Sequence, residues 1–311
     1  MSKPIKDLRI IFMGTPAFAV ASLSAIINAG LHVVAVVTAP DKPAGRGMLL
    51  TETAVKKFAL SKSIPILQPT NLKDATFLKE LGSFHADLQI VVAFRMLPEV
   101  VWNMPPMGTI NLHGSLLPQY RGAAPINWAL INGEKETGVT TFKLKHAIDT
   151  GDILLQETIP LDDHTNAGDL HDEMMMVGAD LLVKTIKGIS AGTLAEKPQM
   201  IDATISLKSA PKIHNADCII DFNKSVETVH NRIRGLSPFP GALTTLKGKT
   251  LKIFKTEKEW AVPAESTGTP VSDGKTFLKF ACTNGYVLCK EVQLEGKKKM
   301  DTETFLRGYR F

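Results

Sequence analysis

The sequence has few cysteines, few aromatic residues and no long hydrophobic run. Three cysteines among 311 residues, none of them in a C-x-x-C pair, argue against a disulfide scaffold and against a zinc site. The longest apolar runs, such as Leu31–Thr38, are far shorter than the roughly 20 residues that cross a bilayer. Residues 1–7 lack both the apolar core of a signal peptide and the Arg-rich pattern of a transit peptide. We therefore expect a globular protein of the reducing cytoplasm, with no membrane partner.

Charge is distributed unevenly along the chain. Residues 216–311 carry 16 basic and 11 acidic side chains, and this excess equals the whole net charge of +5. Residues 1–215 are neutral on balance. A basic module joined to a neutral one suggests that the basic part holds a polyanionic substrate. A lysine surface that only keeps the protein in solution is an equally good interpretation of charge alone.

The first half of the chain alternates apolar strands with helices. Repeated βαβ units of this kind predict an α/β fold with a doubly wound, mostly parallel sheet covered on both faces. We expect strands at residues 8–13, 31–38, 64–67, 87–94, 109–113, 138–144 and 152–159, and helices at 17–29, 52–61, 74–81, 126–131 and 168–186. Ligands of such sheets bind at the carboxyl ends of the strands.

The last third of the chain has a different pattern. Short strands are expected at residues 242–247, 250–256, 268–272, 275–283 and 286–294, separated by glycine-bearing turns. Five such strands predict a small β-barrel of the oligonucleotide-binding (OB) type. The polar, proline-containing stretch before them suggests a catalytic domain at residues 1–205, a linker at 206–215 and a binding domain at 216–311.

One segment combines a strand with chemically useful side chains. In Thr109–His113, Asn111 and His113 are two residues apart, so they share one face of the strand, which breaks at Gly114. A neutral hydrogen-bond donor beside a titratable group at a strand end is suited to acyl transfer. Asp149 lies in an Asp-Thr-Gly-Asp loop, where its ordinary role is to form the turn. Its functional role would be to orient and charge-stabilise the imidazole of His113.

Two other kinds of site are disfavoured. The first strand ends at Gly14, but the second and third glycines of a dinucleotide-binding turn are missing. His164 and His171 lack the spacing of metal ligands, so we expect no metal. The glycine-bracketed basic loop at residues 41–48 could contact phosphates, although an exposed connector is the simpler interpretation.

The segment Asn111–Ala129, followed by Thr137–Thr140 and Asp149–Asp152, resembles the folate-dependent formyltransferase family. Three further stretches resemble the methionyl-tRNA formyltransferases within it: Lys42–Gly47, Ala210–Ile213 with Asn231–Ala242, and Val292–Met300 with Phe305–Gly308. The resemblance covers nearly the whole chain. One departure is Phe94–Arg95–Met96, where the family more often has Tyr-Gly and an aliphatic residue.

The resemblance implies roles for particular residues. Asn111, His113 and Asp149 would be catalytic. A folate site would be lined by Ser115, Leu116, Leu117 and Pro118, with Arg95 at its edge. Contacts to tRNA would come from Lys42 and Arg46 in the basic loop and from Lys297, Lys298 and Lys299 in the barrel.

The resemblance also implies an activity. A monomeric bacterial enzyme would transfer the formyl group of 10-formyltetrahydrofolate, its co-substrate, to the α-amine of initiator methionyl-tRNA. Asn111 and His113 would donate hydrogen bonds to the formyl oxygen, and Asp149 would help to remove the amine proton. Two alternatives stay open: a formyltransferase acting on an amino-sugar nucleotide, and a non-catalytic RNA-binding protein.

Overall fold

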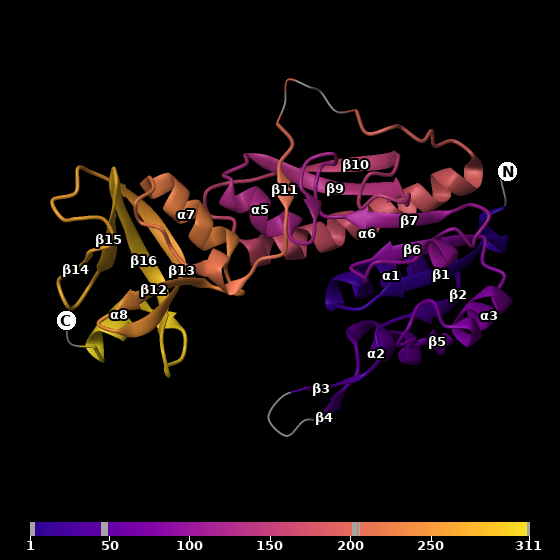
Figure 1. Ribbon diagram of the computed structural model, residues 1–311, viewed down its shortest axis with the longest axis horizontal. Coiled ribbons are helices and arrows are strands. Elements are labelled where there is room, and N and C mark those ends of the chain that lie inside the picture. The colour runs from indigo at the N-terminus through magenta and orange to yellow at the C-terminus, as the bar shows by residue number, and fades with distance from the viewer. Residues whose placement is uncertain (1–3, 45–48, 201–203, 205, 310–311) are drawn as a thin grey trace. The chain divides into compact units, whose positions relative to one another are not determined.

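The structure is a computed structural model that describes residues 4–44, 49–200, 204 and 206–309. The chain forms two compact units (Figure 1). The first contains residues 1–121, 138–159 and 172–207, and the second contains 122–137, 160–171 and 208–311. The second unit thus gathers two earlier segments around the C-terminal residues, whereas the division at 206–215 treats each domain as one continuous stretch.

The first unit is built on a seven-stranded sheet in the order β10-β9-β7-β6-β1-β2-β5. The strands β1, β2, β5, β6 and β7 pair in parallel, and β9 pairs antiparallel with β7. Their bounds are β1 Arg9–Gly14, β2 His32–Val37, β5 Ile66–Leu67, β6 Leu88–Val92, β7 Thr109–His113, β9 Glu136–Lys143 and β10 Ile153–Pro160. The predicted doubly wound, mostly parallel sheet is confirmed. Its core is the row of fully buried residues along β1, β2 and β6.

Four helices accompany this sheet where the sequence pattern predicts them: α1 Ala17–Asn28, α2 Ala54–Ser61, α3 Ala75–Ser83 and α6 Ala167–Ala191. The short α4 Glu99–Trp102 was not predicted. Thr53 and Asp74 cap α2 and α3 by accepting hydrogen bonds from Lys56 N and Phe77 N, both at 3.0 Å. Helix α6 packs closely on β7, because a Cβ atom at Gly178 would lie only 2.8 Å from Leu112.

The second unit contains a curled antiparallel sheet in the order β12-β13-β16-β15-β14, with β17 beside β16. This is the predicted C-terminal β-structure, in the form of a half-barrel. Its elements are α5 Pro125–Ile131, η2 Asn215–Cys218, α7 Val226–Gly235, β12 Ala242–Leu246, β13 Lys249–Trp260, β14 Pro270–Ser272, β15 Leu278–Cys282, β16 Gly285–Leu294, β17 Met300–Asp301 and α8 Thr302–Arg307. Helix α7 packs on β13 and closes one side of the apolar core.

Buried polar groups fasten α7 to residues 160–171 of the same unit. The imidazole of His230 bonds to Thr256 Oγ1 at 2.9 Å and to the Asp163 carbonyl oxygen at 3.0 Å. Arg234 donates to the carbonyls of Asp162 and Thr165 at 2.7 and 3.1 Å. Burial lowers the pKa of His230, and nearby positive charges lower it further.

All three cysteines of the chain lie in this unit and are unpaired. Cys218, Cys282 and Cys289 are each at most 2% exposed. Burial raises the pKa of all three thiols, that of Cys282 to about 11.

Short elements complete the chain: η1 Ile5–Asp7, the β8–β11 pair (Arg121–Gly122 with Ser209–Ala210) and a hairpin of β3 Lys42–Ala44 with β4 Leu49–Thr51. None of the helices in the described residues is long and apolar enough to span a membrane. Within the same residues, no group of three or more His, Cys, Asp or Glu side chains could hold a metal ion.

Candidate active site

Strand β7 presents two polar side chains at its carboxyl end. Its residues pair in parallel with β6 and antiparallel with β9, so β7 is an interior strand of the sheet. Asn111 and His113 share one face of it, as the alternation of a strand requires. His113 is 6% exposed and Asn111 is half-buried. The ring of His113 meets that of Phe142 edge to face, with centroids 6.5 Å apart.

The loop between β9 and β10 brings Asp149 to His113. Asp149 Oδ2 lies 3.8 Å from His113 Nδ1, and the side chains are 13% and 7% exposed. The other ring nitrogen, Nε2, lies 2.9 Å from the carbonyl oxygen of Tyr120. A carbonyl oxygen only accepts hydrogen bonds, so Nε2 donates there. The Nδ1 side of the ring is therefore the one that faces the carboxylate.

The side-chain amide of Asn111 is available to a ligand. Among the residues that the structure describes, no group forms a hydrogen bond with this amide. An amide donor, an imidazole and a carboxylate thus meet at the carboxyl end of β7, the edge at which parallel sheets bind ligands. Groups of these types can stabilise a developing oxyanion and transfer a proton.

The Asp149 loop has a constrained backbone. Asp149 has a φ of +53°, in the left-handed region that costs a non-glycine residue about 1–2 kcal/mol. Gly151 lies so close to β9 that a Cβ atom there would be 1.7 Å from the carbonyl oxygen of Lys143. The backbone nitrogen of Lys143 also bonds to Asp152 O at 3.0 Å. The loop is therefore held tightly against the end of β9.

The predicted folate-lining segment, Ser115–Pro118, follows β7 directly. Ser115 and Leu117 are buried, and the Ser115 hydroxyl donates to the Gln119 carbonyl at 2.6 Å. Thr140 and Gln156 anchor the segment through hydrogen bonds to the carbonyls of Ser115 and Leu117, at 2.6 and 3.0 Å. Leu116 and Pro118 are only half-buried, so a ligand would contact their side chains rather than those of the other two.

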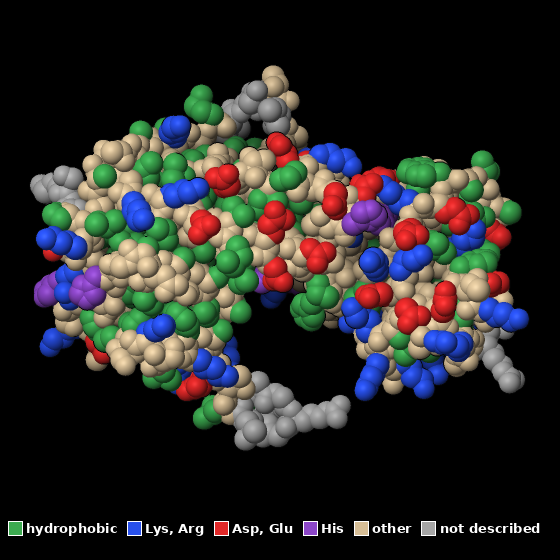
Figure 2. Space-filling view, turned by 180° about the vertical axis from the view of Figure 1, so that it is seen from behind, with side chains coloured by type: hydrophobic (Ala, Val, Ile, Leu, Met, Phe, Trp, Pro, Cys, Tyr) green, Lys and Arg blue, Asp and Glu red, His purple; other side chains and the backbone are tan. Residues whose placement is uncertain are grey.

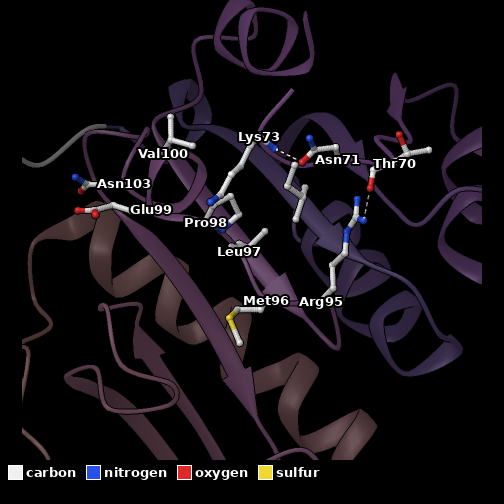
Figure 3. Close-up of a pocket in the computed structure, with 11 residues that line it drawn as sticks. Thr70, Asn71, Lys73, Arg95, Met96, Leu97, Pro98, Glu99, Val100 and Asn103 are labelled. Atoms are coloured by element: carbon white, nitrogen blue, oxygen red, sulfur yellow. Dashed lines mark hydrogen bonds between the residues drawn. The ribbon is translucent and has the colours of Figure 1, made fainter. Parts of the chain in front are cut away.

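A pocket of about 1110 Å³ lies between the loop after β5 and the segment after β6 (Figure 3). Lys73 and Arg95 supply positive charge, and the remaining lining is Thr70, Asn71, Leu72, Met96, Leu97, Pro98, Glu99, Val100 and Asn103. The predicted catalytic residues do not line it. The segment that follows β6 supplies one side of its lining, and β6 itself is the parallel neighbour of β7 in the sheet.

Arg95 joins the two sides of this pocket. Its guanidinium donates to the carbonyl oxygens of Pro69 and Thr70, the latter at 2.9 Å, and lies 5.7 Å from the centroid of the Phe94 ring. Because carbonyl oxygens carry no net charge, the positive charge of Arg95 stays available at the pocket.

The residues predicted to contact tRNA lie on the surface. Lys42 is exposed on β3, where it pairs with Thr51. Arg46 lies outside the described residues. Lys297, Lys298 and Lys299 form the exposed turn between β16 and β17, in which Lys299 Nζ lies 2.9 Å from Glu291 and 5.5 Å from the centroid of the Phe254 ring. Lys and Arg side chains gather along one edge of the C-terminal unit (Figure 2).

Sequence reasoning did not single out three residues that are connected by hydrogen bonds to the predicted catalytic group, directly or through one another. Tyr120 supplies the carbonyl that binds His113, Gln199 bonds to the Asp149 loop, and Arg121 bonds to Gln199. Arg121 lies inside the family motif that follows Pro118, which was a usable signal. Gln199 follows a proline in an irregular segment, and no pattern in the sequence distinguishes it.

Comparison with known proteins agrees with this geometry. Residues 8–186 match the formyl transferase family, and residues 212–310 match the C-terminal domain of formyl transferases. The chain is 54% identical to a methionyl-tRNA formyltransferase of Azobacteroides pseudotrichonymphae, over 96% of this chain and 95% of the relative. It is 50% identical to that of Bacteroides fragilis, over 98% and 96%.

Solved structures with the same fold are more distant in sequence. An N-formyltransferase from Helicobacter canadensis, in complex with folinic acid and dTDP-3-aminofucose, superposes with a TM-score of 0.68 at 20% identity, over 94% of this chain and all of the other. HypX from Aquifex aeolicus, in complex with tetrahydrofolic acid, gives 0.65 at 18%, over 96% of this chain and 47% of the other. With both family matches and relatives half identical over nearly their full length, the chain belongs to the formyl transferase family, among the methionyl-tRNA formyltransferases.

Proposed function

We propose that the chain transfers the formyl group of 10-formyltetrahydrofolate to the α-amine of initiator methionyl-tRNA, giving the N-formylmethionyl-tRNA that starts translation. Relatives about half identical over nearly the whole chain, all methionyl-tRNA formyltransferases of bacteria, support this activity and a bacterial cytoplasmic location. The proposal includes action as a monomer. It also keeps residues 1–205 as the catalytic domain and 216–311 as the tRNA-binding domain, joined by 206–215.

The observation that carries the proposal is the meeting of His113 and Asp149 beside the Asn111 amide. Residues 36 positions apart in the chain place Nδ1 and Oδ2 3.8 Å apart at the carboxyl end of β7. A chain that kept the fold only as an RNA-binding scaffold would have no need of this arrangement.

The chemistry follows from the atoms that face the reacting centre. The neutral amine attacks the formyl carbon, a new C–N bond forms, and negative charge develops on the formyl oxygen. The Asn111 amide donates to that oxygen. The imidazole of His113 donates from Nδ1, because Nε2 is already committed to the Tyr120 carbonyl. A ring that donates from both nitrogens is a cation, and the carboxylate of Asp149 is its counter-ion.

Collapse of the tetrahedral intermediate breaks the bond from the formyl carbon to N10 of the folate. The amine has then lost one proton, and N10 has gained one. Asp149 is suited to accept the proton from the amine, directly or through one water molecule, since its carboxylate is only 13% exposed and lies beside His113. No covalent intermediate with the enzyme is needed.

The pocket beyond β6 is suited to the folate donor. Ser115, Leu116, Leu117 and Pro118 are not part of its lining. They would contact the part of the donor nearer the reacting centre, with Leu116 and Pro118 offering side-chain contacts. The donor carries a glutamate tail, and Lys73 and Arg95 provide positive charge in the pocket. The departure from the family pattern at Arg95 therefore supplies a contact for the tail and is compatible with donor binding.

The basic surface of the C-terminal unit is suited to the phosphate backbone of tRNA. Lys297, Lys298 and Lys299 would contact phosphates there, and Lys42 and Arg46 of the basic loop at residues 41–48 would do so as well. Contacts of this kind supply affinity that falls as salt concentration rises.

One assay tests the activity directly. The purified protein is incubated with 10-formyltetrahydrofolate and [³⁵S]methionyl-tRNA, and the product is analysed as N-formylmethionine after deacylation. Formylation that depends on both substrates and is stronger with initiator than with elongator methionyl-tRNA is expected. A protein that binds the tRNA without forming product would be a scaffold, and the proposal would be wrong.

A second candidate function is formylation of an amino-sugar nucleotide, which is favoured by the similarity in fold to the Helicobacter canadensis enzyme. That likeness rests on 20% identity, whereas identity to the methionyl-tRNA formyltransferases is about half. A parallel reaction with a dTDP-amino sugar in place of tRNA distinguishes the two, because only the true acceptor should consume the donor at a useful rate.

A further inference from the structure

We propose that Gln199 and Arg121 are positioning residues that hold Asp149 in register with His113. This inference rests on the proposed function, because it concerns how the catalytic pair is assembled. Neither side chain faces the formyl group; each acts through the loop that carries Asp149 or through the segment that binds His113.

Gln199 grips the Asp149 loop at two points. Its amide nitrogen Nε2 donates to the carbonyl oxygens of Asp149 and Gly151, each at 2.8 Å. These bonds use both hydrogens of the amide, so the side chain has a single orientation. The two acceptors flank Thr150, and fixing them fixes the turn on which the Asp149 carboxylate stands.

Arg121 fixes Gln199 from the other end. Its Nε and Nη2 atoms donate to Oε1 of Gln199 at 3.1 and 2.6 Å. A cation that donates to the amide oxygen polarises the amide and strengthens the bonds that its NH2 group donates. The two residues thus form one chain of hydrogen bonds from a guanidinium to two backbone carbonyls.

The hydrogen bonds close a ring that includes both partners of the catalytic pair. Arg121 directly follows Tyr120, whose carbonyl binds Nε2 of His113. The path therefore runs from His113 to Tyr120, along the chain to Arg121, across to Gln199, and on to Asp149, which faces His113 again at 3.8 Å. Fixing the distance between the two loops fixes the distance between the imidazole and the carboxylate.

The backbone at both loops needs this support. Asp149 and Tyr120 have φ values of +53° and +59°, which non-glycine residues adopt only when the surroundings hold them there. The segment that carries Gln199 is itself anchored, because Lys197 and Ile153 exchange two backbone hydrogen bonds of 2.8 and 2.9 Å. The backbone that carries Gln199 is consequently held in place.

The test replaces Gln199 and separates kcat from KM. Gln199→Ala removes all four hydrogen bonds, and Gln199→Glu keeps an acceptor for Arg121 but sets a carboxylate oxygen against the two carbonyls. Each is expected to lower kcat about 10- to 100-fold, because a displacement of about 1 Å at a catalytic group costs up to about 10²-fold in rate. The KM for methionyl-tRNA should change less than about twofold.

Two controls guard against a general loss of structure. Met200, the next residue, is 84% exposed, and Met200→Ala should leave kcat unchanged. The folded fraction of each variant is checked by circular dichroism and by its affinity for the tRNA. At the Arg121 end of the hydrogen-bond chain, Arg121→Lys should retain more activity than Arg121→Ala, because an ammonium can still donate one of the two hydrogen bonds to Oε1 of Gln199.

A double-mutant cycle with Asp149 gives the decisive result. If Gln199 acts through Asp149, the Gln199→Ala change should cost little or nothing further in the Asp149→Asn background. Full additivity of the two losses would overturn the positioning role, as would a wild-type kcat in Gln199→Ala. Failure of the proposed function would look different, because the wild-type protein itself would then form no N-formylmethionyl-tRNA.

Discussion

The carboxylate of Asp149 lies against the Nδ1 side of His113, and the opposite nitrogen of the ring is held by a backbone carbonyl. The ring therefore cannot turn its Nε2 toward a ligand without breaking a buried hydrogen bond. The Nδ1 edge of the imidazole, which also faces the Asp149 carboxylate, is therefore the part of His113 that can act on a substrate.

Replacing Asn111 or Asp149 tests the reacting centre. Asn111→Ala removes an oxyanion donor, and Asp149→Asn removes the negative charge beside the ring. Each is expected to lower kcat by about 10²–10³-fold, the usual loss for one such donor, without weakening tRNA binding. Single-turnover formylation together with filter binding of methionyl-tRNA measures both quantities. A near-wild-type kcat in either variant would remove that residue from the mechanism.

Gly151→Ala tests the close approach of the Asp149 loop to β9. The added methyl group would lie 1.7 Å from Lys143 O and 3.0 Å from the Phe142 ring, which itself contacts His113. We expect a loss of about 1–3 kcal/mol in the free energy of unfolding, typical of overpacking, and a lower kcat. Urea denaturation and steady-state kinetics measure the two effects.

The matched control is Gly82→Ala near the end of α3, where the nearest atom to a new Cβ is 4.0 Å away. This change should leave kcat unaltered and raise stability slightly, because alanine is the better helix former. Equal behaviour of the two variants would show that the space around Gly151 does not matter.

Neutralising Lys297, Lys298 and Lys299 together tests the basic turn of the C-terminal unit. The KM for methionyl-tRNA should rise about tenfold in low salt, and kcat should persist. The slope of log affinity against log salt should fall by about 2 to 3, since each of the three phosphate contacts contributes about 0.7–0.9. A double Lys62→Ala/Lys79→Ala variant, at the C-cap of α2 and on α3, is the control. An unchanged salt slope in the triple variant would contradict the assignment.

His230 predicts a pH dependence of stability. Burial lowers its pKa in the folded protein below 6.5, and the positive charges of Lys258 and Arg234 act in the same direction, while Glu227 and the Asp163 carbonyl oppose them. Below pH 6.5 the unfolded chain therefore binds a proton that the folded chain does not. The contribution of His230 is complete above pH 6.5 and declines as the pH falls below it.

The measurement compares wild type with His230→Gln by urea denaturation between pH 8 and pH 5.5. At pH 8 the variant should be less stable by about 1–3 kcal/mol, because buried hydrogen bonds are lost. This gap should narrow toward pH 5.5. His164→Gln, at an exposed position, should show no such trend. A gap that stays constant across the range would mean that His230 binds its proton equally well in the folded and unfolded states, and the prediction would be wrong.

Periodicity in the sequence was enough to predict most of the fold. Apolar runs separated by helical patterns predicted the parallel strands and the helices between them, such as the helix expected at residues 74–81, which corresponds to α3. The hairpin of β3 and β4 was missed because each strand has three residues, too few to show alternation. Helix α4 was missed because four residues after Pro98 leave no helical period to detect.

The candidate site was only partly visible in the sequence. The two-residue spacing of Asn111 and His113 placed both on one face of a strand, since that follows from local geometry. The approach of Asp149 to His113 depends on how the loop between β9 and β10 folds over the end of β7. The spacing of residues in the sequence does not show this contact, and only the resemblance to the family indicated it. Gln199 lies 50 residues from Asp149 and 78 from Arg121, so its contacts follow only from the tertiary fold.

The enclosure of Cys218, Cys282 and Cys289 has a practical consequence. Alkylating reagents and peroxide react with the thiolate form of cysteine. These three sulfurs are shielded from solvent, and their raised pKa values keep them protonated. Iodoacetamide should accordingly label the chain only in molecules whose half-barrel has opened. The rate of labelling of the native cysteines therefore reports the rate at which this unit unfolds locally.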